Sequence, residues 1–269
     1  MSGFLRQACA DARQRVVEAA RLVPLAQLQT SPAPAVPSLA GALAAPGVGV
    51  IAEVKRASPS RGHIAWVPNP AAHAAAYARG GACAISVLTE PAHFHGTLGD
   101  LEAVAAAVAV PVIRKDFLVD AYQVWEARRA GASAALLIVA ALDDHELIAL
   151  LRACDEARIE ALVEVHDVSE ARRAGTALEA AGPARPVVGV NARDMATLQV
   201  DPHRFAACVA ALPRGCLAVA ESGIDSPDAV RRAGDAGADA VLVGEHLAAA
   251  IDPEAATRAL ATATVRTTA

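Results

Sequence analysis

The stretch VGVIAEV at residues 48–54 decides how the chain is expected to fold, because it is the first of eight similar runs. Each run is short, apolar and rich in β-branched residues, which is typical of a buried strand in a parallel sheet. The other seven runs lie at residues 82–88, 110–114, 134–139, 159–165, 186–190, 217–221 and 240–243. Stretches with helical periodicity separate them, for example residues 121–129 and 226–233.

Eight strand–helix units predict an α/β fold of the closed (β/α)8 type, the TIM barrel. Strands that alternate with helices pair in parallel through right-handed crossovers. An open doubly wound sheet would more often carry a GxGxxG motif after its first strand, and this sequence has none. Gly-Ala pairs at 81–82, 131–132 and 237–238 come just before strands, as helix C-caps should. We therefore expect one domain, with the barrel over residues 48–269.

Residues 1–47 predict an N-terminal helical extension and linker. In the first 28 residues, Leu5, Cys9, Ala12 and Val16 recur at helical spacing, which predicts one amphipathic helix. Residues 29–47 are rich in Pro, Ala and Ser and predict an irregular connection. We interpret the extension as packing on the barrel, with a lid over one barrel end as the alternative.

The composition excludes several classes of protein. With 54% hydrophobic residues and 3% aromatic residues, the core must consist mainly of aliphatic side chains. The net charge of −5 argues against nucleic acid and anionic membranes as partners. The five cysteines form no CxxC pair and predict reduced thiols. The N-terminus lacks the apolar core of a signal peptide, and no apolar stretch is long enough to span a bilayer. We expect a cytoplasmic protein.

Two of the 24 basic residues are lysines, Lys55 and Lys115, and all the others are arginines. Arginine stays protonated in proteins, whereas lysine can give up a proton and regain it. Because this chain uses arginine wherever a surface cation suffices, each remaining lysine is a candidate for proton transfer.

Polar residues lie where the apolar runs stop, and in barrel enzymes these strand ends carry the catalytic groups. The candidates at these ends are Glu53, Lys55, Lys115, Glu164, Asn191 and Glu221. A solvated salt bridge would account for any single pair among them. Their convergence on one end of a barrel instead predicts an acid–base site, because opposite charges in a partly desolvated mouth shift each other's pKa values.

A second group of residues predicts a phosphate site. Ser222-Gly223 and Gly244-Glu245 follow the seventh and eighth runs, and the loops at these positions bind phosphate in this fold. Arg193, after the sixth run, adds a positive charge. The histidines are less informative. His93 and His95 have the spacing of a metal pair, but a surface loop is the commoner case, and we interpret His166 as a rim residue.

Several motifs, taken in order, resemble those of the indole-3-glycerol-phosphate synthase family over roughly residues 4–250. They are IAEVKRASPSRG (51–62), SVLTE (86–90), FHGT (94–97), PVIRKDF (111–117), LLIVAAL (136–142), LVEVH (162–166), VGVNARD (188–194), VAESGI (219–224) and VLVGE (241–245). The sequence departs from the family pattern in two places. Thr97 stands where serine is more usual, and the segment between Glu164 and Asn191 is longer than expected.

The resemblance implies a carboxy-lyase of tryptophan biosynthesis. The enzyme would close the ring of 1-(2-carboxyphenylamino)-1-deoxyribulose 5-phosphate with loss of carbon dioxide and water, without a cofactor or metal. It implies that Lys115 is the general acid, that Glu164 is its base or acid partner, and that Lys55 holds the substrate carboxylate and can act as acid in the dehydration. The residues that orient these catalytic groups through hydrogen bonds would be Glu53, Asn191 and Glu221. The substrate-binding positions would be Ser58, Phe94, Phe117 and Leu136. The phosphate-binding positions would be Lys55, Arg193, Ser222, Gly223, Gly244 and Glu245.

Two other classes of protein share these features. One is another barrel enzyme of the same pathway, phosphoribosylanthranilate isomerase or tryptophan synthase α. The isomerase needs a cysteine at the end of its first strand, where this chain has Glu53 and Lys55. The other is a non-catalytic phosphate-binding barrel, which would have no need to keep lysine in place of arginine. We expect a monomer or a weak homodimer.

Overall fold

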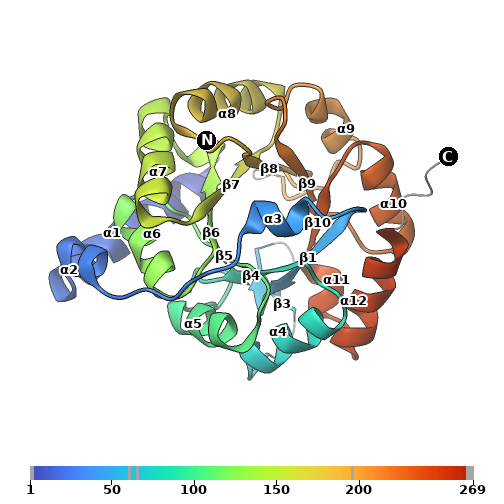
Figure 1. Ribbon diagram of the computed structural model, residues 1–269, viewed down its shortest axis with the longest axis horizontal. Helices are drawn as coiled ribbons and strands as arrows, with labels where there is room; N and C mark the ends of the chain where they lie inside the picture. Colours follow the sequence, from blue (N-terminus) through green and yellow to red (C-terminus); the bar gives the residue numbers. More distant parts are fainter. Residues whose placement is uncertain (1–2, 60–61, 65–66, 195–196, 265–269) are drawn as a thin grey trace.

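The computed structural model describes residues 3–59, 62–64, 67–194 and 197–264 of the chain. Its central feature is a closed barrel of eight parallel strands surrounded by helices (Figure 1). The strands are β1 (Gly49–Val54), β4 (Ala84–Leu88), β5 (Val112–Lys115), β6 (Ala134–Ile138), β7 (Glu160–Val165), β8 (Val187–Asn191), β9 (Leu217–Glu221) and β10 (Ala240–Val243). The barrel closes where β1 pairs in parallel with both β10 and β4. The predicted TIM barrel is confirmed.

Helices cover the outside of the barrel and connect its strands (Figure 1). They are α4 (Pro70–Arg79), α5 (Leu98–Ala107), α6 (Ala121–Arg129), α7 (Asp144–Ala157), α8 (Val168–Ala181), α9 (Arg204–Val209), α10 (Pro227–Asp235), α11 (Glu245–Ala248) and α12 (Pro253–Ala261). The 3-10 turns are η1 (Val139–Ala141) and η2 (Thr262–Thr264). Side-chain caps fix where helices begin: Thr97 starts α5 and Asp143 starts α7, each in a reciprocal capping box. The hydroxyl of Thr97 therefore caps α5, a role that serine could equally fill.

A small hairpin, β2 (Ala57–Ser58) with β3 (Gly62–His63), follows β1 and was not predicted. It places part of the loop after β1 in antiparallel pairing. Two-residue strands are too short to produce a periodic apolar signal, which explains why the sequence pattern did not reveal them.

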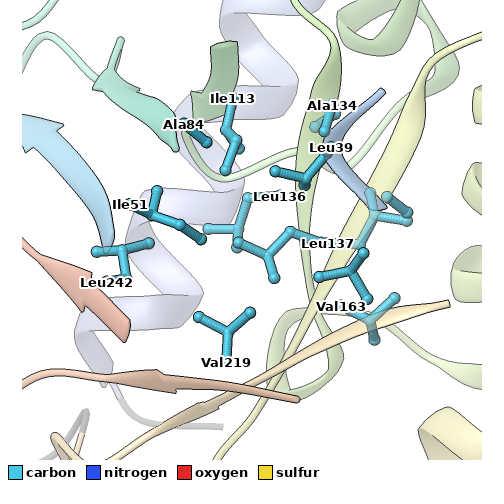
Figure 2. Close-up of a cluster of buried hydrophobic side chains, with 14 of the residues drawn as sticks. Leu39, Ile51, Ala84, Ile113, Ala134, Leu136, Leu137, Val163, Val219 and Leu242 are labelled. Atoms are coloured by element: carbon cyan, nitrogen blue, oxygen red, sulfur yellow. The ribbon is translucent and has the colours of Figure 1, made fainter. Parts of the chain in front are cut away.

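Aliphatic side chains fill the inside of the barrel. Ile51, Leu136, Val219 and Leu242 come from four different strands and approach one another within the ring (Figure 2). Each is at most 4% exposed. This packed layer lies below the strand ends, so it supports the polar site from beneath and closes the barrel to water.

The N-terminal segment forms α1 (Gly3–Leu22), α2 (Leu25–Thr30) and α3 (Leu39–Leu43). The prediction of one helix over the first 28 residues was wrong, because Pro24 interrupts it. Proline disfavours a helical conformation in the residue before it and cannot donate a backbone hydrogen bond. The prediction that this segment packs on the barrel is supported by Leu5 and Cys9 of α1, which belong to the main apolar core. No helix within the described ranges is both long and apolar enough to cross a membrane.

Helix α3 lies across one end of the barrel, where the strands begin (Figure 1). Its N-terminus is held by Glu160, the first residue of β7. The Glu160 carboxylate accepts hydrogen bonds from the backbone N–H groups of Leu39 and Ala40 and from the Ser38 hydroxyl, the last at 2.8 Å. A carboxylate at a helix N-terminus also interacts favourably with the helix dipole.

We expect Glu160→Ala to lower the free energy of unfolding by about 2 kcal/mol, because three donors lose a charged acceptor. Urea unfolding followed by circular dichroism measures this loss. Glu156→Ala, at an exposed position of α7, is the control and should change stability by less than about 0.5 kcal/mol. Equal stability losses in the two variants would contradict the role of Glu160 in anchoring α3.

Candidate active site

The predicted site residues gather around one cavity of about 720 Å³ at the C-terminal ends of the strands. Fourteen of them line it: Glu53, Lys55, Ser58, Phe94, Lys115, Phe117, Leu136, Glu164, Asn191, Arg193, Ser222, Gly223, Gly244 and Glu245. Glu221 lies just behind the cavity wall and is 1% exposed. The structure thus brings together all the residues that the strand-end pattern and the family motifs selected.

Lys115 is the centre of the charged part of the cavity. It ends β5, and its Nζ donates a hydrogen bond to Oε2 of Glu221 at 2.9 Å. The same Nζ lies 3.4 Å from Oε2 of Glu53 and 3.9 Å from Oε2 of Glu164. These three carboxylates come from β9, β1 and β7, so the closure of the barrel is what assembles them.

The surroundings of Lys115 keep it protonated. Burial alone would lower its pKa, but the carboxylates of Glu221, Glu53 and Glu164 outweigh burial and raise the pKa above the ordinary value. The expected mutual pKa shift at the barrel mouth is thus upward for Lys115. The ammonium group is available as a proton donor at every physiological pH.

The pKa values of the neighbouring carboxyls Glu164 and Glu221 shift in opposite directions. Burial raises the pKa of both carboxyls, but for Glu164 the neighbouring His166 and Lys115 outweigh burial and lower the pKa. For Glu221, burial and the nearby Glu164 charge together raise the pKa despite the hydrogen bond from Lys115. A pair of buried carboxyls with diverging pKa values suits one for accepting a proton and the other for holding one.

Lys55 pairs with the other carboxylate oxygen of Glu53, at 2.7 Å. The space for this pair depends on Gly244, the residue after β10. A Cβ at position 244 would overlap Oε1 of Glu53 and would lie 3.2 Å from Nζ of Lys55. Lys55 therefore lies beside the loop after β10.

A glycine also leaves the space for Glu221. A Cβ at Gly189, in the middle of β8, would overlap Oε1 of Glu221. That oxygen is buried and accepts no hydrogen bond from any described residue. Gly189 was not predicted as a site residue, because a glycine inside an apolar run has no distinguishing pattern.

The loops after β8, β9 and β10 meet at the other side of the cavity. Ser222 has a left-handed backbone (φ 67°), and its hydroxyl donates to Oδ1 of Asn191 at 2.8 Å. The same Oδ1 accepts the backbone N–H of Arg193 at 3.0 Å. The Arg193 guanidinium lies 2.8 Å from Oε1 of Glu245. Asn191 therefore organises two loops at once.

Aromatic side chains form the apolar wall. The rings of Phe94 and Phe117 lie 6.4 Å apart, and Phe4 of α1 packs edge-on against Phe117 at 5.9 Å. Phe4 lines the cavity and was not predicted, because a lone aromatic in an amphipathic helix is ordinarily a core residue. Arg15 of α1 bonds Asp116, the neighbour of Lys115, at 3.0 Å. Helix α1 thus contributes to the site as well as packing on the barrel.

His166 was wrongly interpreted as a rim residue. Its side chain is 10% exposed, and its Nε2 lies 3.3 Å from Oε1 of Glu164. Strand alternation places residues 164 and 166 on the same face, so this neighbour was readable from the sequence. His93, considered for metal binding, packs its ring against Phe4 at 5.0 Å. The described residues contain no cluster of His, Cys, Asp and Glu that could hold a metal ion.

These features define the class of protein: a (β/α)8 barrel with a lysine–carboxylate centre at the C-terminal ends of its strands. Two solved structures share the fold. Thiamine phosphate pyrophosphorylase from Pyrococcus furiosus has a TM-score of 0.59 at 17% identity, with coverage of 84% of this chain and 97% of that one. N-acetylmannosamine-6-phosphate 2-epimerase from Clostridium perfringens has a TM-score of 0.59 at 14% identity, with coverage of 80% and 93%.

Sequence comparison gives the family. The family model for indole-3-glycerol phosphate synthase matches residues 5–260. The indole-3-glycerol phosphate synthase of Mycobacterium avium is 49% identical over 90% of this chain and 88% of its own length. That of Micrococcus luteus is 48% identical over 95% and 93%. The chain belongs to the indole-3-glycerol phosphate synthase family, whose members are carboxy-lyases of tryptophan biosynthesis.

Proposed function

We propose that the residues around Lys115 catalyse the formation of indole-3-glycerol phosphate from 1-(2-carboxyphenylamino)-1-deoxyribulose 5-phosphate. The aromatic carbon that bears the carboxylate attacks the ketone, carbon dioxide leaves, and water is then eliminated. The observation that carries this proposal is a half-buried Lys115 whose Nζ lies within 4 Å of Glu53, Glu164 and Glu221 at the wall of a cavity of about 720 Å³.

Lys115 is the general acid of the ring closure. As the aromatic carbon bonds to the ketone carbon, the ketone oxygen becomes an alkoxide and needs a proton. An alkoxide is a stronger base than an amine, so transfer from Lys115 is favourable although its pKa is raised. Loss of carbon dioxide from the ring carbon then restores aromaticity.

Glu164 is the base of the dehydration. This step removes the new hydroxyl together with a proton from the adjacent methylene carbon, which becomes part of the pyrrole ring. Because the pKa of Glu164 is lowered by His166 and Lys115 against the effect of burial, its carboxylate is ionised and able to accept that proton. Lys55 protonates the leaving hydroxyl, while Glu53 orients both lysines.

The substrate binds along the cavity from the apolar wall to the three loops. Phe94, Phe117 and Leu136 contact the anthranilate ring, with Ser58 at the edge of the same cavity. The phosphate binds at the backbone of Ser222, Gly223, Gly244 and Glu245 beside Arg193. Lys55 lies next to Gly244, which supports its contact with the phosphate.

We expect Arg193→Ala to raise KM for the phosphorylated substrate by about tenfold to a hundredfold with a smaller change in kcat. The reason is that the guanidinium binds the phosphate equally in the ground state and the transition state. Steady-state kinetics measures the two constants. Arg173→Ala, which removes an arginine of α8 outside the cavity, is the control. A drop in kcat with KM unchanged would assign Arg193 to the chemistry instead.

Incubation of the purified chain with the carboxyphenylamino-deoxyribulose phosphate tests the proposed function. We expect the indole chromophore to form with release of one carbon dioxide per product. Well-folded protein that binds the substrate without forming indole would support a non-catalytic phosphate-binding barrel. Turnover of phosphoribosylanthranilate or of indole-3-glycerol phosphate itself would support one of the other barrel enzymes of the pathway.

We further propose that the enzyme acts in the cytoplasm as a monomer or weak homodimer, without nucleic acid, membrane or metal. The net charge of −5 supports the absence of nucleic acid. Residues 1–47 form the extension and residues 48–269 the barrel in this proposal. Analytical ultracentrifugation measures the oligomeric state.

A further inference from the structure

His166 lies directly behind Glu164 at the end of β7, on the side away from Lys115. Its Nε2 is 3.3 Å from Oε1 of Glu164, while Lys115 approaches the other carboxylate oxygen at 3.9 Å. The Glu164 carboxylate is 2% exposed. Each oxygen of this buried carboxylate therefore has one nitrogen cation beside it.

Glu170 holds the ring of His166 from behind. Nδ1 of His166 lies 3.1 Å from Oε2 of Glu170, and the same oxygen accepts the backbone N–H of His166 at 2.8 Å. Glu170 is itself fixed in the first turn of α8, because its backbone N–H donates to the N-cap residue Asp167 at 2.8 Å. The ring is thus held at Nδ1 by Glu170, while Nε2 makes no hydrogen bond to a described residue and faces Glu164 at ion-pair distance.

The charged groups around His166 keep it an imidazolium. Burial lowers the pKa of His166, but Glu164 and Glu170 outweigh burial and raise the pKa to about 10. From β5 and β9, each two strands away from β7 in the barrel, Lys115 and Glu221 act on Glu164. The Cys208 thiol of α9 is near the charges of Asp167, Arg204, Glu170 and Asp201.

We propose that His166 is a positioning residue for the reaction: with Glu170 behind it, its ring fixes the Glu164 carboxylate beside Lys115. The inference rests on the proposed function of Glu164 as the base. Without the ring, Glu164 would share Lys115 with Glu221 and Glu53 as its one remaining cation. A carboxylate buried to this degree would then take up a proton and lose its ability to accept another.

Two variants separate contact with Glu164 from the charge. In His166→Gln the amide reaches the position of Nε2 beside Glu164, but it carries no charge. In His166→Asn the amide ends near the position of Nδ1, so it can contact Glu170 but not Glu164. We expect kcat to fall about tenfold in His166→Gln and about a hundredfold in His166→Asn, with KM within about threefold of wild type.

The pH dependence of kcat distinguishes this role from a merely structural one, because a structural role of His166 would leave the profile unchanged. We expect its acidic limb to shift to higher pH by about one unit or more in both variants, because each lacks the cation that keeps Glu164 ionised. His145→Gln, at an exposed position of α7, is the matched control and should leave the limb in place. The position of the limb does not depend on the fraction of folded enzyme, so a lower yield cannot imitate the shift.

Two results would overturn the inference while leaving the proposed function intact. One is an acidic limb that stays in place in both variants, while the wild-type enzyme forms indole. The other comes from the wild-type protein alone: nitrogen-15 NMR of His166 should show an imidazolium at pH 8, and a neutral ring would remove the cation. Absence of indole formation by the wild-type enzyme would instead reject the proposed function.

Discussion

Replacing Lys115 with arginine is expected to lower kcat by about a thousandfold and to change KM by less than about tenfold. Arginine keeps the positive charge that faces Glu221, Glu53 and Glu164, so the carboxylates stay paired and the substrate still binds. A guanidinium does not give up its proton, so the developing alkoxide has no donor. Steady-state kinetics with the carboxyphenylamino-deoxyribulose phosphate measures both constants.

Lys115→Met is the companion variant, because it removes the charge as well as the proton. Its loss of kcat should equal or exceed that of Lys115→Arg, and it should also be less stable because three buried carboxylates lose their cation. Near-normal kcat in Lys115→Arg would remove Lys115 from the acid role and transfer that role to Lys55.

The eight strands could be predicted from the sequence because each is buried on both faces and therefore apolar throughout. The run at 217–221 coincides with β9, and the run at 134–139 exceeds β6 by one residue. The N-terminal helices were predicted less well, since an amphipathic pattern continued past Pro24 while the helix did not. Periodicity reports which side is buried, whereas helix ends depend on local backbone chemistry.

The members of the site were predictable, but their electrostatics were not. Strand ends select Lys115 and Glu164 without reference to what faces them across the barrel. The raised pKa of Lys115 is the net result of burial opposed by carboxylates from three other strands, and such a balance depends on distances. The raised pKa of His166 was not predictable for the same reason, because its charged partner Glu170 belongs to the next helix.

Gly189 of β8 leaves the space that the Glu221 side chain occupies beside Lys115. Gly189→Ala is expected to lower both stability and activity. The backbone of Gly189 is not left-handed, so alanine is acceptable at this position of β8 on conformational grounds. The obstacle is Glu221, whose Oε1 occupies the space that a Cβ needs. We expect a loss of about 1–3 kcal/mol in the free energy of unfolding, as for other overpacked cores. We also expect kcat to fall about tenfold or more, because the carboxylate moves away from its hydrogen bond to Lys115.

A double-mutant cycle with Glu221→Ala shows whether the carboxylate is the cause. In the Glu221→Ala background the space is empty, so the added methyl of Gly189→Ala should cost less than about 0.5 kcal/mol, and the coupling between the two sites should exceed about 0.5 kcal/mol. Urea unfolding of the four proteins supplies the cycle. An equal cost in both backgrounds would mean that Gly189 is required by the strand itself or by the nearby Leu162 side chain, which lies 3.4 Å from the same Cβ position. A strong coupling would mean that a residue with no chemistry of its own determines where the partner of the catalytic lysine can be placed.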